Sequence, residues 1–215
     1  MLKSVYKSGG FYVGKYETGI ETTPKTSGLP SVLLAETPKI KQNAYPYNYV
    51  TCRQAQTLAN SMESGSYTTS LLFGVQWDLT LKYLETKGTK QADLNSDSIA
   101  WGNYKDNLWN ITNADSKYST DYGNTWTSGA YGAKGSNRYI LLSTGASDTF
   151  SKQGIYDLAG NVNEWTLEYS SDSSVPCAWR GGIYENNGVN YPAAYRYSSN
   201  TTFYYDVVGL RVVLY

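Results

Sequence analysis

The chain has 215 residues, 18 basic and 18 acidic side chains and a formal net charge of zero, and this length suits one domain, residues 1–215, with a sizeable core. Because the phosphate backbone is normally met by clustered Lys and Arg, the balanced charge disfavours a nucleic-acid partner. Histidine is absent, which excludes His-based catalytic triads, His-ligated zinc sites and two-His iron centres.

The first predicted elements are a strand, a surface excursion and a capped helix. Residues 11–17 are rich in aromatic side chains, which favours a strand. Residues 18–48 are rich in Pro, Ser, Thr and Gly, which is typical of a loop. Thr51 and Gln54 have the spacing of a capping box, and we predict a helix of about three turns after them, ending at Ser64. Apolar residues recur there at helical spacing: Ala55, Leu58, Ala59 and Met62.

A second helix is predicted over residues 74–87. Lys87 followed by Gly88 is a suitable end, because a cation favours the last turn and glycine accepts a positive φ. The apolar residues form two faces that we take to be neighbours: Trp77, Leu81 and Leu84 on one, and Val75, Leu79 and Tyr83 on the other. So wide an apolar surface predicts that the helix is deeply buried.

The rest of the chain predicts long loops and a small sheet. Residues 89–135 are dominated by small polar residues and Tyr, and we expect loops pinned by Trp101, Trp109 and Trp126 rather than disorder, since disordered segments are poor in aromatic residues. Strands are predicted at residues 138–143, 165–169, 178–182 and 210–215. Together with the helices they predict an α+β fold.

Two further features bear on compartment. Cys52 and Cys177 are far apart and form no CxxC pair, so we favour two separate buried thiols, with a disulfide as the alternative. No apolar run is long enough to span a bilayer, and residues 1–10 lack the apolar core of a signal peptide. We therefore expect no membrane insertion and no signal peptide in this chain.

Seven stretches, in order along the chain, together resemble one family. They are FYVGKYETG (11–19), YVTCRQAQTLANSM (49–62), SLLFGVQWDLTLKYLETKG (70–88), IAWGN (99–103), GIYDLAGNVNEWT (154–166), RGG (180–182) and GLRVV (209–213). The sequence resembles the formylglycine-generating-enzyme, or sulfatase-modifying-factor, type of C-type lectin fold. The resemblance implies two helices around a small mixed or antiparallel sheet with long loops.

The most specific of these stretches have physical roles of their own. Arg180 beside Gly181 and Gly182, and Arg211 after Gly209, suit a framework in which backbones approach closely and a guanidinium bridges carbonyls or a carboxylate. Asn161 and Glu164 lie at a tight turn, and the resemblance implies a structural calcium ion there, although no cofactor is required. The alternative is that Glu164 accepts backbone N–H bonds while Trp165 fills the core.

Both enzymatic branches of the family lack their ligands in this sequence. In the formylglycine-generating enzymes, paired cysteines follow the Gly-Gly turn, but residues 183–197 contain no cysteine and Cys177 precedes the turn. The iron-dependent relatives use a histidine cluster, and this chain has no histidine. Without these thiolates or imidazoles we predict no catalytic residues and no enzyme, with an atypical oxidase using Cys52 and Cys177 as the less favoured alternative.

The segment 183–207 instead resembles the variable region of proteins diversified by retroelements, which share this lectin fold. In that family, mutagenesis of Asn codons spreads a position over Asn, Tyr, Ser, Ile, Val, Phe and Asp. We predict that twelve interleaved positions of this kind form the ligand-binding surface: Ile183, Tyr184, Val189, Tyr191, Tyr195, Tyr197, Ser198, Ser199, Phe203, Tyr204, Tyr205 and Val207.

The resulting hypothesis is a binding module with an exposed, Tyr-rich surface, because Tyr supplies contact area at low entropic cost. The resemblance implies a phage particle or a bacterial surface as the setting, and a protein or glycan on another cell as the ligand. The alternative is an invariant structural or lectin-like virion or surface domain in which these residues are ordinary packing. Ligand identity, oligomeric state and host are beyond the sequence.

Overall fold

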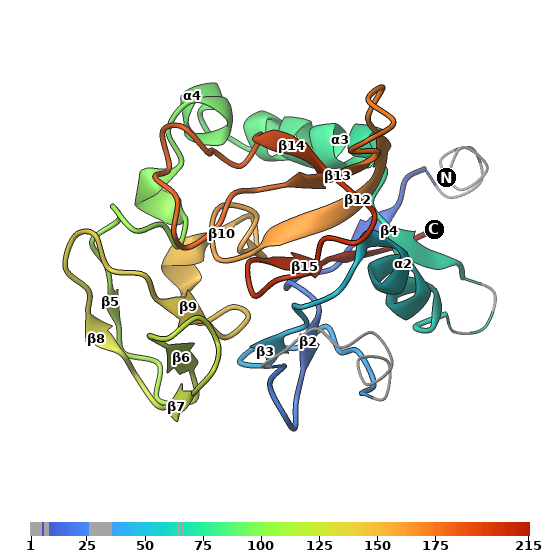
Figure 1. The fold of residues 1–215 in the computed structure, drawn as a ribbon. Helices are drawn as coiled ribbons and strands as arrows, with labels where there is room; N and C mark the ends of the chain where they lie inside the picture. Colours follow the sequence, from blue (N-terminus) through green and yellow to red (C-terminus); the bar gives the residue numbers. More distant parts are fainter. Residues whose placement is uncertain (1–5, 7–8, 26–35, 64, 66) are drawn as a thin grey trace.

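A computed structural model describes residues 6, 9–25, 36–63, 65 and 67–215 (Figure 1). Its elements confirm the predicted α+β fold. The helices are α2 (Cys52–Asn60), α3 (Gly74–Thr86) and the short α4 (Gln91–Asn95), with single 3₁₀ turns η1 (Ile99–Trp101) and η2 (Asp148–Phe150). Among the described residues, no helix is long and apolar enough to cross a membrane.

A four-stranded mixed sheet is built from strands between residues 163 and 210. Its order is β14 (Arg196–Ser199), β13 (Cys177–Arg180), β12 (Asn163–Tyr169) and β15 (Val208–Leu210). β13 pairs antiparallel with both β12 and β14, whereas β12 and β15 are parallel. The predicted strand at 210–215 is in fact two strands, β15 and β16 (Val212–Leu214), which join different sheets on either side of Arg211.

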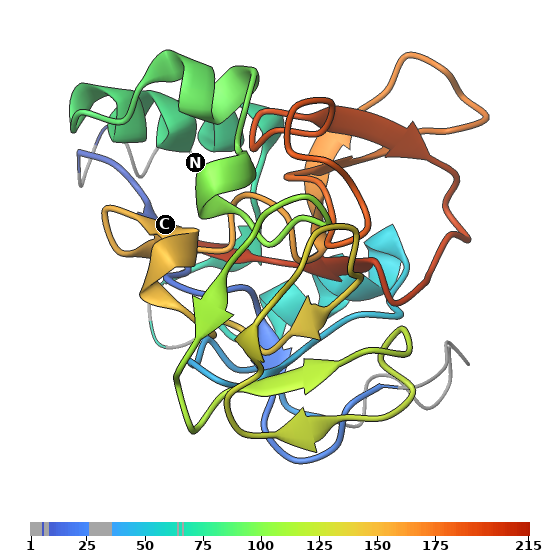
Figure 2. The ribbon, with the colours of Figure 1, turned by 90° about the vertical axis from the view of Figure 1, so that its left-hand side faces the viewer.

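The remaining sheets are small. A three-stranded sheet has the order β1 (Tyr12–Val13), β16 and β4 (Thr69–Leu71), and another has β7 (Thr127–Ser128), β6 (Lys117–Ser119) and β9 (Leu141–Leu142). Two-stranded sheets join β2 (Gly19–Ile20) to β3 (Tyr45–Pro46), β5 (Asn110–Ile111) to β8 (Gly132–Ala133), and β10 (Ser151–Lys152) to β11 (Ile155–Tyr156). Figures 1 and 2 show β5 to β9 gathered at one end of the molecule, away from α3.

The first helix begins as predicted. The Thr51 side chain accepts a hydrogen bond from Gln54 N, and Gln54 Oε1 accepts one from Thr51 N, which completes the capping box. Ala55, Leu58 and Ala59 are buried against the four-stranded sheet, in a cluster that also holds Trp165 and Trp179. The helix ends at Asn60, so the predicted end at Ser64 and Gly65 was several residues too late. Ser64 itself and residues 26–35 of the excursion lie outside the described residues.

The second helix is present but is not deeply buried all round. Trp77, Leu81 and Leu84 are buried, whereas Val75, Leu79 and Tyr83 are 50%, 48% and 46% exposed. At 3.6 residues per turn these two sets lie on nearly opposite faces of α3, not on neighbouring ones. One face packs on the sheet and the other faces solvent, so the prediction of deep burial was wrong.

Candidate functional site

The two glycines after β13 redirect the chain into the C-terminal segment. Gly181 and Gly182 have φ of +100° and +78°, values that residues with a Cβ rarely adopt. A Cβ on Gly182 would also lie 2.6 Å from the Tyr191 carbonyl oxygen. Arg180 donates to both carboxylate oxygens of Glu168 (2.8 and 3.1 Å) and to the Ala194 carbonyl (3.1 Å). The segment is thereby tied back to the sheet that carries it.

A second arginine supports the site from inside the molecule. Arg211 is fully buried and donates from Nε and Nη2 to the Glu164 carboxylate, at 2.6 to 2.9 Å. Its Nη1 donates to the Gly14 carbonyl at 2.8 Å, which joins the two ends of the described chain. Burial, and then the charges of Asp157 and Glu164, raise the pKa of Glu17 well above its usual value.

The residues proposed for calcium are already committed to protein donors. Both oxygens of Glu164 accept from Arg211 Nε at 2.9 Å. Asn161 Oδ1 accepts from Asn103 Nδ2 at 3.0 Å and from the Leu142 N–H at 3.1 Å. Within the described part of the chain, no group of three or more Cys, Asp and Glu side chains is arranged to hold a metal ion. A hard cation needs six or more oxygen ligands, and this arrangement does not fit one.

Cys52 and Cys177 are free thiols, as predicted, but they are half-buried rather than buried and the fold brings them close together. Cys52 begins α2 and Cys177 begins β13, and both pack against the same core cluster because α2 lies across that end of the sheet. Burial, and then the nearby Cys177, raise the pKa of the Cys52 thiol to about 12. A thiol of this kind is rarely a thiolate, the form that attacks substrates and binds metals.

The twelve predicted surface positions divide into exposed and buried ones. Tyr197 and Tyr205 are 55% and 57% exposed, and Val189 is also exposed. Seven more are half-buried: Ile183, Tyr191, Tyr195, Ser198, Phe203, Tyr204 and Val207. Ten of the twelve therefore reach solvent, and the five tyrosines at 191, 195, 197, 204 and 205 are not in the core.

Tyr184 and Ser199 are buried, so the prediction that they belong to an exposed surface was wrong. Tyr184 packs with Leu141 and Val162, and its hydroxyl donates to the Asp206 carboxylate. Ser199 lies opposite Cys177 at the end of the β13–β14 pair. Both residues support the surface from beneath it.

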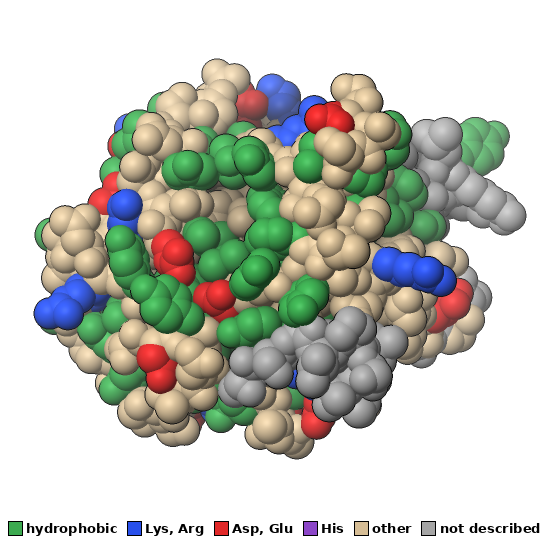
Figure 3. Space-filling view, viewed as in Figure 1, with side chains coloured by type: hydrophobic (Ala, Val, Ile, Leu, Met, Phe, Trp, Pro, Cys, Tyr) green, Lys and Arg blue, Asp and Glu red, His purple; other side chains and the backbone are tan. Residues whose placement is uncertain are grey.

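Six aromatic residues of the 183–207 segment and Trp179 form one unbroken series of ring contacts, which we call the aromatic ladder. Centroid distances between successive rings are 4.6 to 6.2 Å, and Tyr195 stacks on Tyr197 with their planes 12° apart. The order of the ladder is Tyr191, Tyr195, Tyr197, Trp179, Phe203, Tyr205 and Tyr204. Figure 3 shows hydrophobic side chains in a band down this face, between the places where Figure 1 draws β14 and β15.

Trp179 is the member of the ladder that sequence reasoning missed. It is nearly buried, its ring lies 4.9 Å from that of Trp165, and it contacts Tyr197 and Phe203. Trp179 lies in β13 directly opposite Tyr197, and facing residues of paired strands are neighbours. Pairing the predicted strand at 178–182 with the 195–199 stretch would have placed Trp179 beside the predicted surface. Trp179 anchors the exposed rings to the core.

Polar groups border the ladder. Burial raises the pKa of Asp206 and of Glu185, both half-buried in the same segment. Arg196 is exposed on β14 and lies 3.0 Å from Glu168. Rings, phenol hydroxyls, carboxyl groups and one guanidinium can hold a protein or glycan surface by contact and hydrogen bonding.

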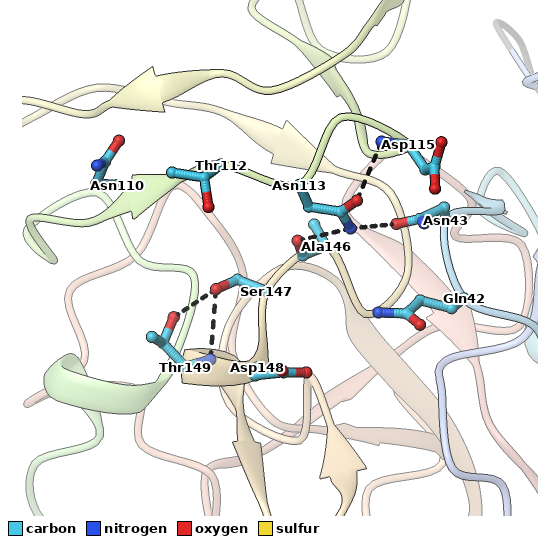
Figure 4. Close-up of a pocket in the computed structure, with 10 residues that line it drawn as sticks. All are labelled: Gln42, Asn43, Asn110, Thr112, Asn113, Asp115, Ala146, Ser147, Asp148 and Thr149. Atoms are coloured by element: carbon cyan, nitrogen blue, oxygen red, sulfur yellow. Dashed lines mark hydrogen bonds between the residues drawn. The ribbon is translucent and has the colours of Figure 1, made fainter.

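A separate polar hollow of about 450 Å³ lies near β5, and no motif predicted it. Figure 4 shows the side chains that line it, which come from separate parts of the chain: Gln42, Asn43, Asn110, Thr112, Asn113, Asp115, Ala146, Ser147, Asp148 and Thr149. Asn113 Nδ2 donates to Asn43 Oδ1 at 3.0 Å across it. It includes none of the ladder residues.

Comparison with known proteins identifies a family. Residues 21–215 match the family described as the sulfatase-modifying factor enzyme 1-like domain. No curated protein sequence matches the chain. Among solved structures, CarF has a TM-score of 0.48 and 17% identity over 77% of this chain, which spans 66% of CarF, just under two thirds. Treponema denticola variable protein 1 has a TM-score of 0.47 and 13% identity over 91% of this chain and 77% of its own.

The family match covers the motifs from the first helix to GLRVV, on which the resemblance was based. It extends through α2, α3 and the four-stranded sheet. The chain belongs to the sulfatase-modifying factor enzyme 1-like domain family.

Proposed function

We propose that this chain is a non-enzymatic ligand-binding module whose C-terminal segment is diversified while its framework stays constant. The aromatic ladder carries the proposal: six of its seven rings occupy interleaved positions, and the seventh, Trp179, anchors them to the core. The resemblance suggests that the module is displayed on a phage particle or a bacterial surface, and that its ligand is a protein or glycan on another cell.

The physical basis is the separation of display from support. The displayed rings are large and have few rotatable bonds, so that a ligand contacts much area at low entropic cost. The support is held by Arg180 and Arg211, whose carboxylate partners Glu168 and Glu164 lie outside the 183–207 segment. Replacing an exposed ring changes the surface that a ligand meets, while these ion pairs keep the scaffold.

Diversification is tested by sequencing the coding segment for residues 178–215 from many members of the source population, together with the DNA just downstream. We expect substitutions of the Asn-codon type at the ten solvent-reaching positions, and a near-copy template beside a reverse-transcriptase gene. An invariant segment would contradict diversification and leave an invariant structural or lectin-like domain.

Binding is tested with a display library of the full chain. Six ladder positions (Tyr191, Tyr195, Tyr197, Phe203, Tyr204 and Tyr205) are varied over Asn, Tyr, Ser, Ile, Val, Phe and Asp, and binders are selected on a panel of purified proteins and glycans. A control library of the same residue types varies Asn110, Thr112, Ser147 and Thr149 around the polar hollow. We expect specific binders from the ladder library and none from the control; equal yields would contradict the proposal.

A second candidate is an atypical oxidase, which the proximity of Cys52 and Cys177 favours. The raised pKa of Cys52 opposes it, because copper binds thiolates. Titration of the full chain with Cu(I), with a Cys52→Ser, Cys177→Ser double variant as the control, separates the two functions. We expect the same weak binding in both proteins, and a tight site lost in the double variant would favour the oxidase.

A further inference from the structure

We infer that the ligand is a polypeptide segment that adds to the free edge of β14 as a fifth strand of the four-stranded sheet. The inference rests on the proposed function and names the chemical class of its ligand. β14 is the terminal strand in the order β14-β13-β12-β15, so that, among the described strands, only β13 pairs with it (Figure 1). It lies within the 183–207 segment and carries Tyr197 of the aromatic ladder.

The hydrogen-bond pattern shows which groups of β14 face outward. Gly181 N donates to the Tyr195 carbonyl, and the register places Tyr197 opposite Trp179. Since bonding alternates along an antiparallel pair, the main-chain groups of Tyr197 and Ser199 point toward β13.

The other side of the sheet gives the same alternation. Asn163 N donates to the Val207 carbonyl, so Asn163 and Trp165 face β15 and the intervening Glu164 faces β13. Glu164 lies opposite Arg180, which therefore bonds to β12 rather than to β14. The hydrogen bonds on the β15 side and on the β14 side therefore give the same result, which is that two other residues of β14 point their main-chain groups away from the sheet.

Those two residues are Arg196 and Ser198. By this alternation their N–H and C=O groups point away from β13, and they make no backbone hydrogen bond to a described residue outside the sheet. Both side chains reach solvent. Two N–H donors and two C=O acceptors, spaced two residues apart, match the edge of an extended polypeptide. A glycan has no repeating pattern of this kind.

The two faces of an added strand would meet different surroundings. Side chains on one face would lie beside Tyr197 and the ladder rings that stack on it. Side chains on the other face would lie beside Arg196 and Ser198. A hollow of about 480 Å³ lies along this strand and is lined by Arg196, Tyr197 and Ser198 together with Ser170, Ser171 and Val175. We expect bound peptides to alternate apolar or aromatic residues with polar or acidic ones.

This mode of binding suits a diversified surface. Main-chain hydrogen bonds at the edge persist whatever side chains occupy positions 195 to 199, so that variation changes specificity while a common docking geometry remains. The edge is short and carries Arg196, features that also limit unwanted pairing between strands.

The test uses the full chain and a displayed library of random linear peptides. Peptides are retained when they bind the wild type and lose affinity for the Tyr197→Ala chain. Each retained peptide is then synthesised with a single N-methyl group at each residue in turn. We expect methylation at every second residue to weaken binding at least about tenfold, and methylation between those residues to have little effect, because alternate N–H groups face the edge.

A pair of protein variants tests the same edge from the other side. Ser198→Pro removes the outward N–H but no bond to β13, and Ser198→Ala removes the same hydroxyl while keeping the N–H. We expect the proline variant to bind retained peptides at least about tenfold more weakly than the alanine variant. Circular dichroism and thermal melting of both variants check that the fold is intact, and the peptide N-methyl scan decides the matter if the proline variant does not fold.

Each outcome decides one of the two proposals. Alternating sensitivity supports strand addition. Peptides that need Tyr197 but show no alternation would overturn strand addition and leave the ligand-binding function standing. Binders found only among glycans or folded proteins would have the same consequence. Pairing of the β14 edges of two copies of this chain would also overturn strand addition by a peptide ligand. Absence of any Tyr197-dependent binder from peptides, proteins and glycans would overturn the proposed function itself.

Discussion

At the scale of single residues, the unusual feature is the charge balance around Arg211. One buried guanidinium faces three buried carboxyl groups, those of Glu164, Glu17 and Asp157. Of the three carboxyl groups, Glu164 accepts hydrogen bonds from Arg211, whereas Asp157 accepts the Gly145 N–H at 2.6 Å. Burial raises the pKa of all three carboxyl groups. Ionising all three at neutral pH would leave buried negative charge that the single guanidinium does not balance.

Replacing Arg211 should therefore be severe. In Arg211→Ala we expect a loss of about 3–5 kcal/mol in the free energy of unfolding, because the buried Glu164 carboxylate would lose the guanidinium that binds it. Arg138→Ala, at an exposed position, is the matched control and should change stability by less than about 0.5 kcal/mol. Urea denaturation measures both variants, and equal effects would show that the ion pair is not structural.

The carboxyl cluster also predicts a pH dependence. Burial raises the pKa of Asp157 to about 7, so the folded protein holds this proton more tightly than the unfolded chain does. The resulting stability is complete below about pH 4 and is lost as the pH rises through about 7. The slope for one group is at most about 1.4 kcal/mol per pH unit.

Asp157→Asn should flatten this decline. Asparagine keeps an acceptor for Gly145 N–H and tolerates the φ of +58° at this position. We expect the free energy of unfolding of the wild type to fall from pH 4 to pH 7 more steeply than that of the variant, measured by urea denaturation across that range. Parallel profiles would mean that Asp157 does not carry the dependence.

At the scale of elements, α3 has two apolar faces, and only one of them is buried. Its inner face packs with Leu72, Leu158 and Ala193, and the Trp77 Nε1 donates to the Ala193 carbonyl at 3.0 Å. Its outer face borders an apolar hollow of about 410 Å³ shared with Phe11 and Tyr12. Apolar spacing alone could not separate these faces, because both have helical periodicity.

The two faces should respond differently to the same change. Leu84→Ala, at a fully buried position, should cost about 2–5 kcal/mol of unfolding free energy through lost burial and the cavity left behind. Leu79→Ala, on the outer face, should cost less than about 1 kcal/mol. Thermal and urea unfolding compare the pair; similar losses would mean that the outer face is covered in solution.

At the scale of the whole molecule, the 183–207 segment contains both the residues that form the exposed surface and buried residues that hold this surface in place. Tyr205 and Tyr184 are both tyrosines at interleaved positions, yet one is 57% exposed and the other 1%. Position in the segment therefore does not by itself say which residues a ligand meets.

This separation predicts opposite costs for one substitution. Tyr205→Ser should change the free energy of unfolding by less than about 1.5 kcal/mol, since it removes ring contacts at the surface. Tyr184→Ser should cost about 3–5 kcal/mol, because it empties a buried site and leaves Asp206 without the hydroxyl. Denaturation of both variants measures this, and a small loss at Tyr184 would contradict the supporting role.

Several features of the fold and site could be predicted because their signals are local. The capping box of α2 needs only Thr51 and Gln54, three residues apart. The turn after β13 needs only the freedom of Gly181 and Gly182. Composition and irregular spacing singled out the 183–207 segment, but they did not separate its exposed tyrosines from the buried Tyr184.

The sequence by itself determined the α+β class, the two main helices and the family, because these depend on neighbouring residues and on ordered motifs. Only the tertiary structure decided which tyrosines are exposed, that Cys52 meets Cys177, and that Arg211 reaches Gly14, 197 positions away. The physical reason is that burial and ion pairing arise where surfaces distant in the chain pack together. No local period of apolar residues records which of two faces will meet such a surface.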